Sequence, residues 1–311
     1  MTSTSHHREL RDQLETLTTE AFRPELADID QLSTLDIARL MNGEDSAVPA
    51  AVAARLPEIA AAIDAVAERM GRGGRLVYAG AGTAGRLGVL DASECPPTFN
   101  TDPSEVVGLI AGGPDAMVTS VEGAEDSAEL ARADLDALAL TGADTVVGIS
   151  ASGRTPYAIG AVEHASSIGA LTIGLACNPG SALAAAAEHG IEVVVGPELL
   201  TGSTRLKAGT AQKLVLNMIS TITMIRLGKT YGNLMVDVRA SNEKLRARSR
   251  RIVALATGAD EEETERALAA TDGEVKNAIL TILAGVDGPT AARLLEDSGG
   301  HLRAALTATG R

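Results

Sequence analysis

Apolar residues recur every three or four positions through the first part of the chain, and this spacing predicts helices. The clearest case is residues 56–70, where Leu, Ile, Ala and Val return at helical intervals. Ser33 suits the N-cap of a shorter helix over residues 35–41. The helical pattern extends from residue 9 to residue 70 and stops at the glycine-rich break of residues 71–74. We therefore expect helices before the first strand.

After that break, short apolar runs rich in β-branched residues alternate with helical patterns. The predicted strands are residues 75–79, 105–110, 144–149, 171–176 and 191–195. Strands that alternate with helices are typical of an α/β fold whose sheet is mainly parallel. The sequence therefore predicts a mainly parallel five-stranded sheet flanked by helices.

The last third of the chain loses the strand pattern. A long apolar helix is expected over residues 204–227 and a second over 241–256, followed by short acidic, Ala-rich helices. Breaks are expected at Gly273, at the Asp287-Gly288-Pro289 turn and at Gly299-Gly300. We divide the chain into residues 1–258, with the sheet-containing core at about 65–230, and a C-terminal helical module at 259–311 that serves as a packing appendage or lid.

Composition narrows the classes of function. The 311 residues suffice for about two domains, and 45% hydrophobic with 22% charged residues is ordinary for a folded globule. The net charge of −14 opposes attraction to nucleic acid or an anionic membrane, so an anionic ligand must be held by local groups. Three Tyr, two Phe and no Trp leave few stacking platforms for single-stranded nucleic acid.

Cysteine spacing and hydropathy indicate the compartment. Cys95 and Cys177 lack the spacing of a metal site or redox motif, so we expect buried free thiols in a reducing compartment. No apolar signal core opens the chain, and polar residues interrupt the longest apolar stretch, 214–227. We expect a cytoplasmic protein.

A glycine-rich turn follows the first predicted strand, with the sequence GAGTAGRLG over residues 80–88. Such a turn lets backbone N–H groups at a helix start face an anion. The glycines at 80, 82 and 85 match a dinucleotide-binding pattern, but the next strand ends at Ile110 with no acid to hold a ribose. We therefore do not expect a nicotinamide cofactor.

A second polar turn, SASGRTP over residues 150–156, follows the third predicted strand. Its hydroxyl and backbone donors form a neutral cage suited to a phosphate monoester. The alternative is a simple helix start, capped by a hydroxyl and with Pro156 at the first helical position. Both turns lie at the carboxyl ends of strands, where open α/β sheets bind ligands.

Two glutamates near these turns are the candidate acids and bases. Glu94 stands between an apolar helix end and Pro96-Pro97, which we expect to hold it firmly. Glu125 has less distinctive neighbours, and both residues could also be ordinary surface acids. The five His residues form no zinc-binding pattern, and neither a G-x-S-x-G elbow nor a Walker loop is present. We expect no metal, no acyl-transfer hydrolase and no P-loop kinase.

Four long motifs resemble those of the N-acetylmuramic acid 6-phosphate etherases. They are VYAGAGTAGRLGVLDASECPPTFN (77–100), ISASGRTPY (149–157), ELLTGSTRLKAGTAQKLVLNM (198–218) and YGNLMVDVRASNEKLR (231–246). The likeness extends from about residue 35 to the C-terminus. It implies a sugar isomerase (SIS) domain, which is a phosphosugar-binding α/β sandwich that works as a homodimer, and a small helical tail similar to ubiquitin-associated domains.

The resemblance also implies a reaction and a set of residues. The D-lactyl ether of N-acetylmuramic acid 6-phosphate would be cleaved to N-acetylglucosamine 6-phosphate and D-lactate, with no metal or other cofactor. Glu94 would protonate the departing lactate and then activate water, and Glu125 would take the C2 proton, although the two roles could be exchanged. The binding residues implied or suggested beside them are Thr83, Ser150, Ser152, Gly153, Thr155, Ser203 and Lys207.

Some points stay open at this stage. Ser203, Thr204 and Lys207 could border the site but are explained nearly as well by helix packing. Ala84 replaces a Ser found in many family members. Two other functions fit an SIS domain: a non-catalytic sugar-phosphate sensor or regulator, and an aldose-ketose phosphate isomerase. Lactate release from the etherase substrate separates the three.

Overall fold

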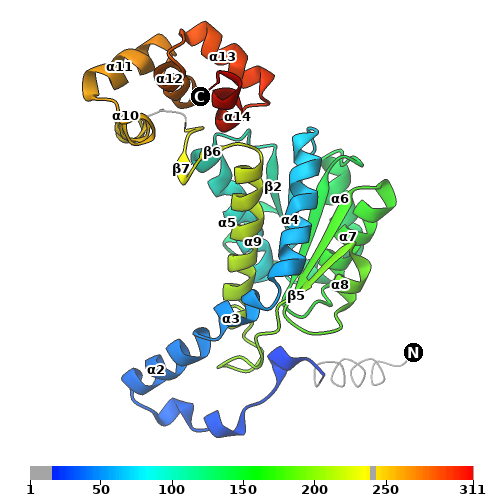
Figure 1. Ribbon diagram of the computed structural model, residues 1–311. Coiled ribbons are helices and arrows are strands. Elements are labelled where there is room, and N and C mark those ends of the chain that lie inside the picture. The colour runs from blue at the N-terminus through cyan, green and yellow to red at the C-terminus, as the bar shows by residue number, and fades with distance from the viewer. Residues whose placement is uncertain (1–15, 239–242, 311) are drawn as a thin grey trace. The chain divides into compact units, whose positions relative to one another are not determined.

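The computed structural model describes residues 16–238 and 243–310 (Figure 1). These residues form two compact units: one contains the chain up to residue 93 together with 105–219, and the other contains residues 94–104 together with the chain from 220 onward. Residues 9–15, where the expected helical pattern begins, and residue 241, where a helix was expected to start, lie outside the described residues.

The first unit is built on a parallel sheet of five strands, which confirms the predicted fold class. Its strands are β1 (Leu76–Gly80), β2 (Val106–Ile110), β3 (Thr145–Ser150), β4 (Leu171–Ala176) and β5 (His189–Glu192). They pair in the order β2-β1-β3-β4-β5, and every pair is parallel.

The fifth strand differs from the predicted one. It was expected at 191–195, but β5 starts at His189 and ends at Glu192, opposite Ala176 at the end of β4. The N–H of Val193 still donates to the carbonyl of Ala176, and β4 offers no further residue for pairing. The apolar run of residues 191–195 therefore continues past the sheet, because the neighbouring strand β4 ends at Ala176.

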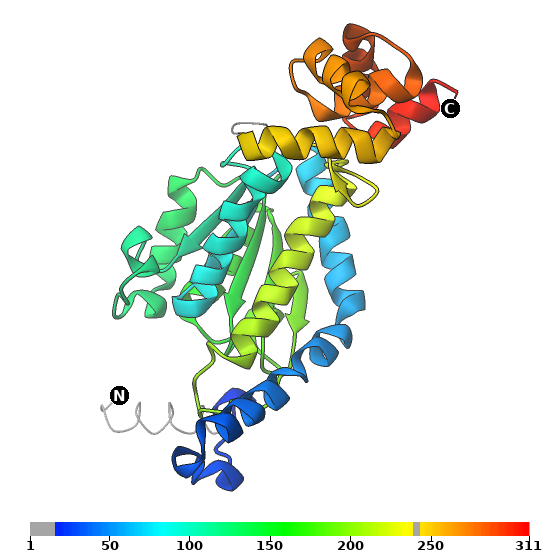
Figure 2. The ribbon, with the colours of Figure 1, turned by 90° about the vertical axis from the view of Figure 1, so that its left-hand side faces the viewer.

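Helices cover both faces of this sheet (Figure 2). The helices of the first unit that pack on it are α4 (Leu56–Gly71), α5 (Gly82–Phe99), α6 (Ala128–Ala137), α7 (Pro156–Ile168) and α8 (Ala182–Ala186). On the face of α5, Gly88 lies so close to Tyr78 of β1 that a Cβ would come within 2.9 Å of it. On the opposite face, Val77 and Val146 share an apolar core with Tyr157 of α7.

The N-terminal segment lies before α4. It contains the 3₁₀ turns η1 (Thr18–Glu20), η2 (Pro24–Leu26) and η3 (Ile29–Gln31), then α2 (Thr34–Asp45) and α3 (Val48–Ala53). As predicted, Ser33 caps α2, by accepting the N–H of Asp36 at 3.2 Å. None of the residues of α2 is buried. This helix therefore leaves its apolar side chains uncovered within the chain.

Helix α9 (Lys207–Arg226) begins three residues later than the sequence predicts. The carboxylate of Glu198 accepts the N–H groups of Lys207 and Ala208, at 3.0 and 2.9 Å. Glu198 is completely buried, and this burial raises its pKa even though both N–H groups favour the charged form. A distant carboxylate therefore sets the start of α9, and the local sequence pattern could not reveal it.

The predicted helix end before Pro96-Pro97 is wrong. Both prolines lie inside α5, which continues to Phe99. Proline cannot donate to the carbonyl four residues earlier, so the last turns of α5 lack two ordinary helical bonds. Glu94 is exposed on this helix, so the prolines do not enclose it.

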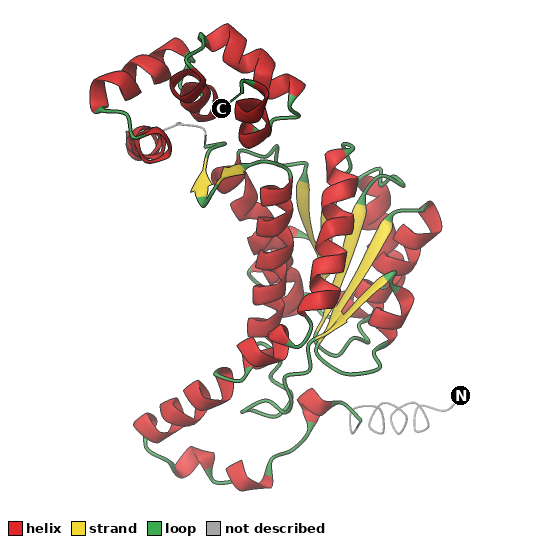
Figure 3. Cartoon of the chain, in the orientation of Figure 1, coloured by secondary structure: helices red, strands yellow, loops and turns green. Residues whose placement is uncertain are grey.

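The second unit is mainly helical, as expected. It contains α10 (Glu243–Thr257), α11 (Glu261–Ala270), α12 (Val275–Ala284), α13 (Gly288–Asp297), α14 (Leu302–Ala308) and the hairpin of β6 (Thr230–Tyr231) and β7 (Leu234–Met235), visible in Figure 3. Their apolar side chains form one core, with Val253 and Ile279 fully buried. Gly288 and Pro289 start α13 and do not form a turn, because Asp287 caps this helix through the N–H of Thr290.

Two further expectations concern the cysteines and the domain boundary. Cys95 and Cys177 are buried thiols outside any disulfide, as predicted, and burial raises the pKa of Cys177 to about 12. The boundary at 258–259 stays a prediction. Helix α10, which precedes this boundary, packs on α11 and α12, which follow it.

Within the described residues no single helix is long and apolar enough to span a membrane. Helices α12 and α13, which are bent against each other, meet the same criterion of length and composition only when they are taken together.

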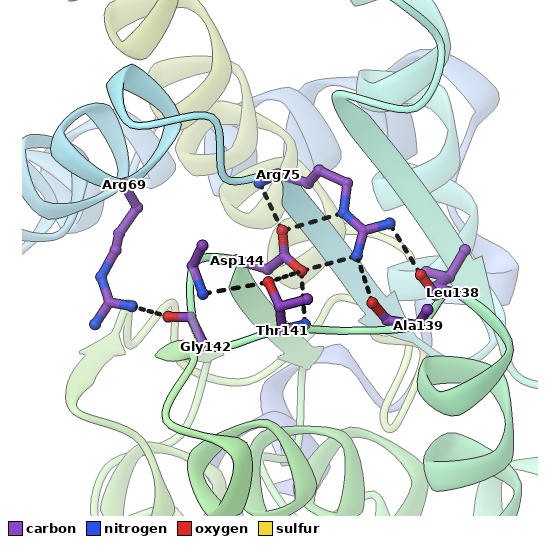
Figure 4. A network of polar contacts seen from close by, with 8 residues as sticks. Arg69, Arg75, Leu138, Ala139, Thr141, Gly142 and Asp144 are labelled. Atoms are coloured by element: carbon purple, nitrogen blue, oxygen red, sulfur yellow. Dashed lines mark hydrogen bonds and ion pairs between the residues drawn. The ribbon is translucent and has the colours of Figure 1, made fainter.

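A buried ion pair joins β1 and β3 at their amino ends (Figure 4). The guanidinium of Arg75 lies 2.8 Å from Asp144, whose carboxylate also accepts the N–H groups of Arg75 and Thr141 at 2.8 Å each. Burial by itself would raise the pKa of Asp144, but these hydrogen bonds outweigh it and lower the pKa to about 2. The carboxylate is therefore charged and fully bonded in the folded chain.

We expect Asp144→Asn to lower the free energy of unfolding by about 2–4 kcal/mol near neutral pH, because it leaves Arg75 without its partner. The lowered pKa means that this stabilisation is present above pH 3.8, the usual aspartate value, and is lost as the pH falls toward about 2. Urea unfolding at about pH 7 and about pH 3 measures the difference. Asp30→Asn, at an exposed site, is the control. The assignment would be contradicted if the difference in unfolding free energy between wild type and Asp144→Asn did not become smaller at the lower pH.

Candidate active site

A cavity of about 510 Å³ opens at the carboxyl ends of β1 and β3. These strands are neighbours, yet the chain leaves β1 toward β2 on one side and leaves β3 toward β4 on the other. Such a reversal of strand order opens a crevice in which α/β sheets bind ligands. The first turns of α5 and α7 both reach the cavity, through Thr83 and Pro156.

Three hydroxyl side chains of the β3–α7 loop form a connected cluster. The hydroxyl of Ser150 lies 2.7 Å from that of Thr155 and 3.2 Å from that of Ser152. Ser150 is almost fully buried, and all three residues line the cavity. Pro156 stands at the start of α7 as predicted, but the hydroxyl of Thr155 bonds Ser150 and makes no capping bond.

Backbone conformation holds this loop in shape. Gly153 has φ +68°, and a Cβ there would lie 2.3 Å from the Cβ of Ser181. Its N–H donates to the hydroxyl of Ser150 at 3.0 Å, and the N–H of Arg154 donates to that of Ser152 at 3.2 Å. Gly153 is buried and does not line the cavity, so it acts by shaping the loop.

The glycine-rich turn forms the opposite wall. Ala81, Thr83 and Ala84 line the cavity at the start of α5. A Cβ on Gly85 would come within 2.5 Å of the carbonyl of Gly80, so the helix can start this close to β1 only with glycine there. Ala84 contributes a methyl group and no hydroxyl, which makes this wall less polar than the β3–α7 loop.

Carboxylates stand at the edge of the cavity. Glu125 and Asp126 come from the turn η5 (Ala124–Asp126), and Glu20 comes from η1. Glu125 is exposed, and it also borders a second, smaller cavity of about 140 Å³ next to Ala81. The cation on the lining is Arg154, whose guanidinium donates to the hydroxyl of Thr16 at 3.2 Å.

The structure brings together five of the nine predicted site residues: Thr83, Glu125, Ser150, Ser152 and Thr155. Ser203 does not line the cavity, whereas its neighbour Thr204 does. Lys207 is buried, and its ammonium group lies 2.6 Å from Glu44 of α2, so its charge is already used by that carboxylate.

Glu94 also stands outside the cavity of its own chain. It lies eleven residues further along α5 than Thr83, which corresponds to about 16 Å at the helical rise of about 1.5 Å per residue. Its side chain is exposed. In a single chain, Glu94 and the β3–α7 loop therefore do not line the same cavity.

Several lining residues were missed by the sequence analysis. Leu17 and Glu20 precede every motif, and nothing in their local sequence marks them. Hydrogen bonds hold their segment in place, because Thr18 donates to the side chain of Asn178 at 2.9 Å. Gln212 could have been found, because it is a polar residue within the apolar pattern of α9.

Comparisons with known proteins found two family models and several solved structures that are similar to the chain. A model of the SIS domain matches residues 125–222, and a model of the N-terminal SIS domain of glucokinase regulatory protein matches residues 58–166. Among solved structures, a putative phosphosugar isomerase from Bacteroides fragilis is 20% identical, covers 62% of this chain and 91% of its own, and gives a TM-score of 0.48.

Curated relatives resemble the chain over its whole length. A protein from Streptomyces coelicolor, named N-acetylmuramic acid 6-phosphate etherase, is 86% identical over 99% of both chains. A protein of the same name from Rubrobacter xylanophilus is 60% identical over 95% of this chain and 97% of its own. The chain belongs to the N-acetylmuramic acid 6-phosphate etherase family.

Proposed function

We propose that this protein is a lyase that cleaves the D-lactyl ether of N-acetylmuramic acid 6-phosphate and yields N-acetylglucosamine 6-phosphate and D-lactate. The observation that carries the proposal is the 86% identity over 99% of both chains to a relative of that name. The cavity at the β1–β3 reversal supports it, because hydroxyl groups and helix starts converge there.

The phosphate binds at the β3–α7 loop. The hydroxyls of Ser150, Ser152 and Thr155 can turn to donate to phosphate oxygens, and the start of α7 adds partial positive charge. Lys207 is paired with Glu44, so the cation beside this loop is Arg154, which lines the cavity of a chain with a net charge of −14. Thr83 approaches the same sugar from the start of α5.

The reaction needs one base and one acid. With the sugar ring open, C1 is an aldehyde, which makes the proton on C2 acidic. A carboxylate removes that proton, C2 and C3 become doubly bonded, and the C3–O bond breaks with its electron pair going to the lactyl oxygen, which a carboxylic acid protonates. Water then adds, its hydroxyl to C3 and a proton to C2, so the net change is hydrolysis of the ether.

Glu125 is the C2 base, because its carboxylate stands at the cavity that holds the phosphosugar. Glu94 is the acid, and its exposed position outside that cavity is explained if it reaches the substrate bound to a second copy of the chain. The protein is then a homodimer with two sites, and each site combines Glu125 of one subunit with Glu94 of the other.

Uncovered apolar side chains support the homodimer. On and beside α2 they are Phe22, Leu32, Leu35, Leu40 and Met41, and on α5 Leu90 is exposed one turn before Glu94. Exposed apolar side chains that gather on one element, as on α2, mark a surface that another chain can cover. With a phosphosugar as its substrate, we also place the enzyme in the cytoplasm.

The activity predicts a product and an exchange reaction. Wild-type protein should release D-lactate from N-acetylmuramic acid 6-phosphate, measured by a coupled lactate assay. Glu125→Gln should lower the rate of C2 hydrogen exchange into deuterated water by at least about 100-fold, the size expected for loss of a general base. Glu122→Gln, on the same exposed turn but outside the cavity, is the control. No lactate from wild type would reject the function, and unchanged exchange would reject Glu125 as the base.

The phosphate loop predicts a loss of affinity. Ser152→Ala should weaken binding of N-acetylglucosamine 6-phosphate by at least about tenfold, because a hydrogen bond to a charged group contributes about 1.5 kcal/mol or more. Calorimetric titration measures the dissociation constant. Ser166→Ala, an exposed serine near the other end of α7, should bind like wild type. If the two variants bind equally well, the phosphate lies elsewhere.

The shared site predicts complementation between inactive variants. Glu94→Gln and Glu125→Gln should each abolish lactate release, but subunits of the two variants that are mixed and reassociated should recover about a quarter of wild-type activity. Half of the dimers are then mixed, and each mixed dimer contains one complete site of two. Sedimentation should give twice the chain mass of 31.8 kDa. A monomeric enzyme, or mixed dimers without activity, would show that Glu94 does not act across subunits.

A further inference from the structure

The proposed reaction leaves one cavity residue without a role. Gln212 lies in the second turn of α9 and lines the cavity together with Thr204, and its side chain is only 1% exposed. Its Nε2 is buried and has no hydrogen-bond partner among the described residues. Of the seven buried side-chain atoms without a partner in the described chain, this is the one that belongs to the cavity lining.

A buried amide nitrogen without an acceptor destabilises a fold, because it has given up its bonds to water and gained none. Packing alone would favour Leu or Met at this position, since the neighbouring positions Ala211, Val215 and Leu216 are buried and apolar. Because Gln212 also lines the cavity, its amide is instead suited to a partner that arrives with a ligand. The amide of Gln212 is therefore explained better by a ligand than by packing.

The chemistry of the cavity narrows the choice of acceptor. The phosphate has the hydroxyl cluster of Ser150, Ser152 and Thr155. The lactyl carboxylate is an anion, and the guanidinium of Arg154, which also lines the cavity, compensates its charge better than a neutral amide. The acetamido group at C2 is neutral, and its carbonyl and N–H match the N–H and carbonyl of a glutamine amide.

We propose that Gln212 is a specificity-determining residue that donates from Nε2 to the carbonyl oxygen of the 2-acetamido group of the substrate. This assignment rests on the proposed phosphosugar function. It gives the site a means to prefer N-acetylated hexosamine phosphates over plain hexose phosphates, because a site built to hydrogen-bond one group rejects the analogue that lacks it.

Binding of two ligands to the full-length protein tests the assignment. Gln212→Leu should weaken binding of N-acetylglucosamine 6-phosphate by about tenfold and leave binding of glucose 6-phosphate, which has a hydroxyl at C2, within about twofold of wild type. Calorimetry measures both dissociation constants. Thr210→Val, at an exposed position on the same helix, is the matched control and should change neither.

The outcomes separate a specificity role from other roles. Equal weakening for both ligands would place Gln212 on the ring or phosphate, and no weakening would remove it from the sugar, so either result overturns the proposal. A purely structural role predicts a lower melting temperature for Gln212→Leu, whereas loss of an unpaired buried donor should leave it unchanged or higher. If wild type binds both sugars but releases no lactate, the reaction fails while the assignment of Gln212 can still hold.

Discussion

The parallel pairing of β1 with β3 is the constraint on which the site depends. Because these two strands are neighbours while their following helices pack on opposite faces, the starts of α5 and α7 face one another across the sheet edge. Glycine makes the approach possible on each side, at Gly85 against the carbonyl of Gly80 and at Gly153 against Ser181. The ion pair of Arg75 and Asp144 holds the same two strands together at their other ends.

Charge is distributed so that an acidic chain can still receive an anion. Lys207 is paired with Glu44, and this pair links α2 to the start of α9. Arg154, within the β3–α7 loop, is the cation among the described residues that line the cavity. In the proposed function, hydroxyl groups and helix starts hold the phosphate beside this guanidinium. The proposed base, Glu125, stands at the edge of the same cavity.

The sequence predicted those features that depend on neighbours along the chain. The alternation of strands and helices, the Ser33 cap and the two polar turns are local patterns, and the structure contains them. Features set by distant residues were missed: the start of α9 depends on Glu198, and β5 ends because β4 does. Family likeness selected Glu94 and Glu125, but no sequence pattern shows that only the second of them lines the cavity of its own chain.

The η1 segment has a consequence for how this protein can be dissected. Leu17 and Glu20 form part of the cavity wall and are held there by Asn178, yet the domain models that match the chain begin at residue 58 and residue 125. A gene fragment trimmed to those boundaries would encode the sheet and the two helix starts but would leave one side of the pocket open to solvent. In this chain, the unit that forms the cavity is longer than either range that the domain models match.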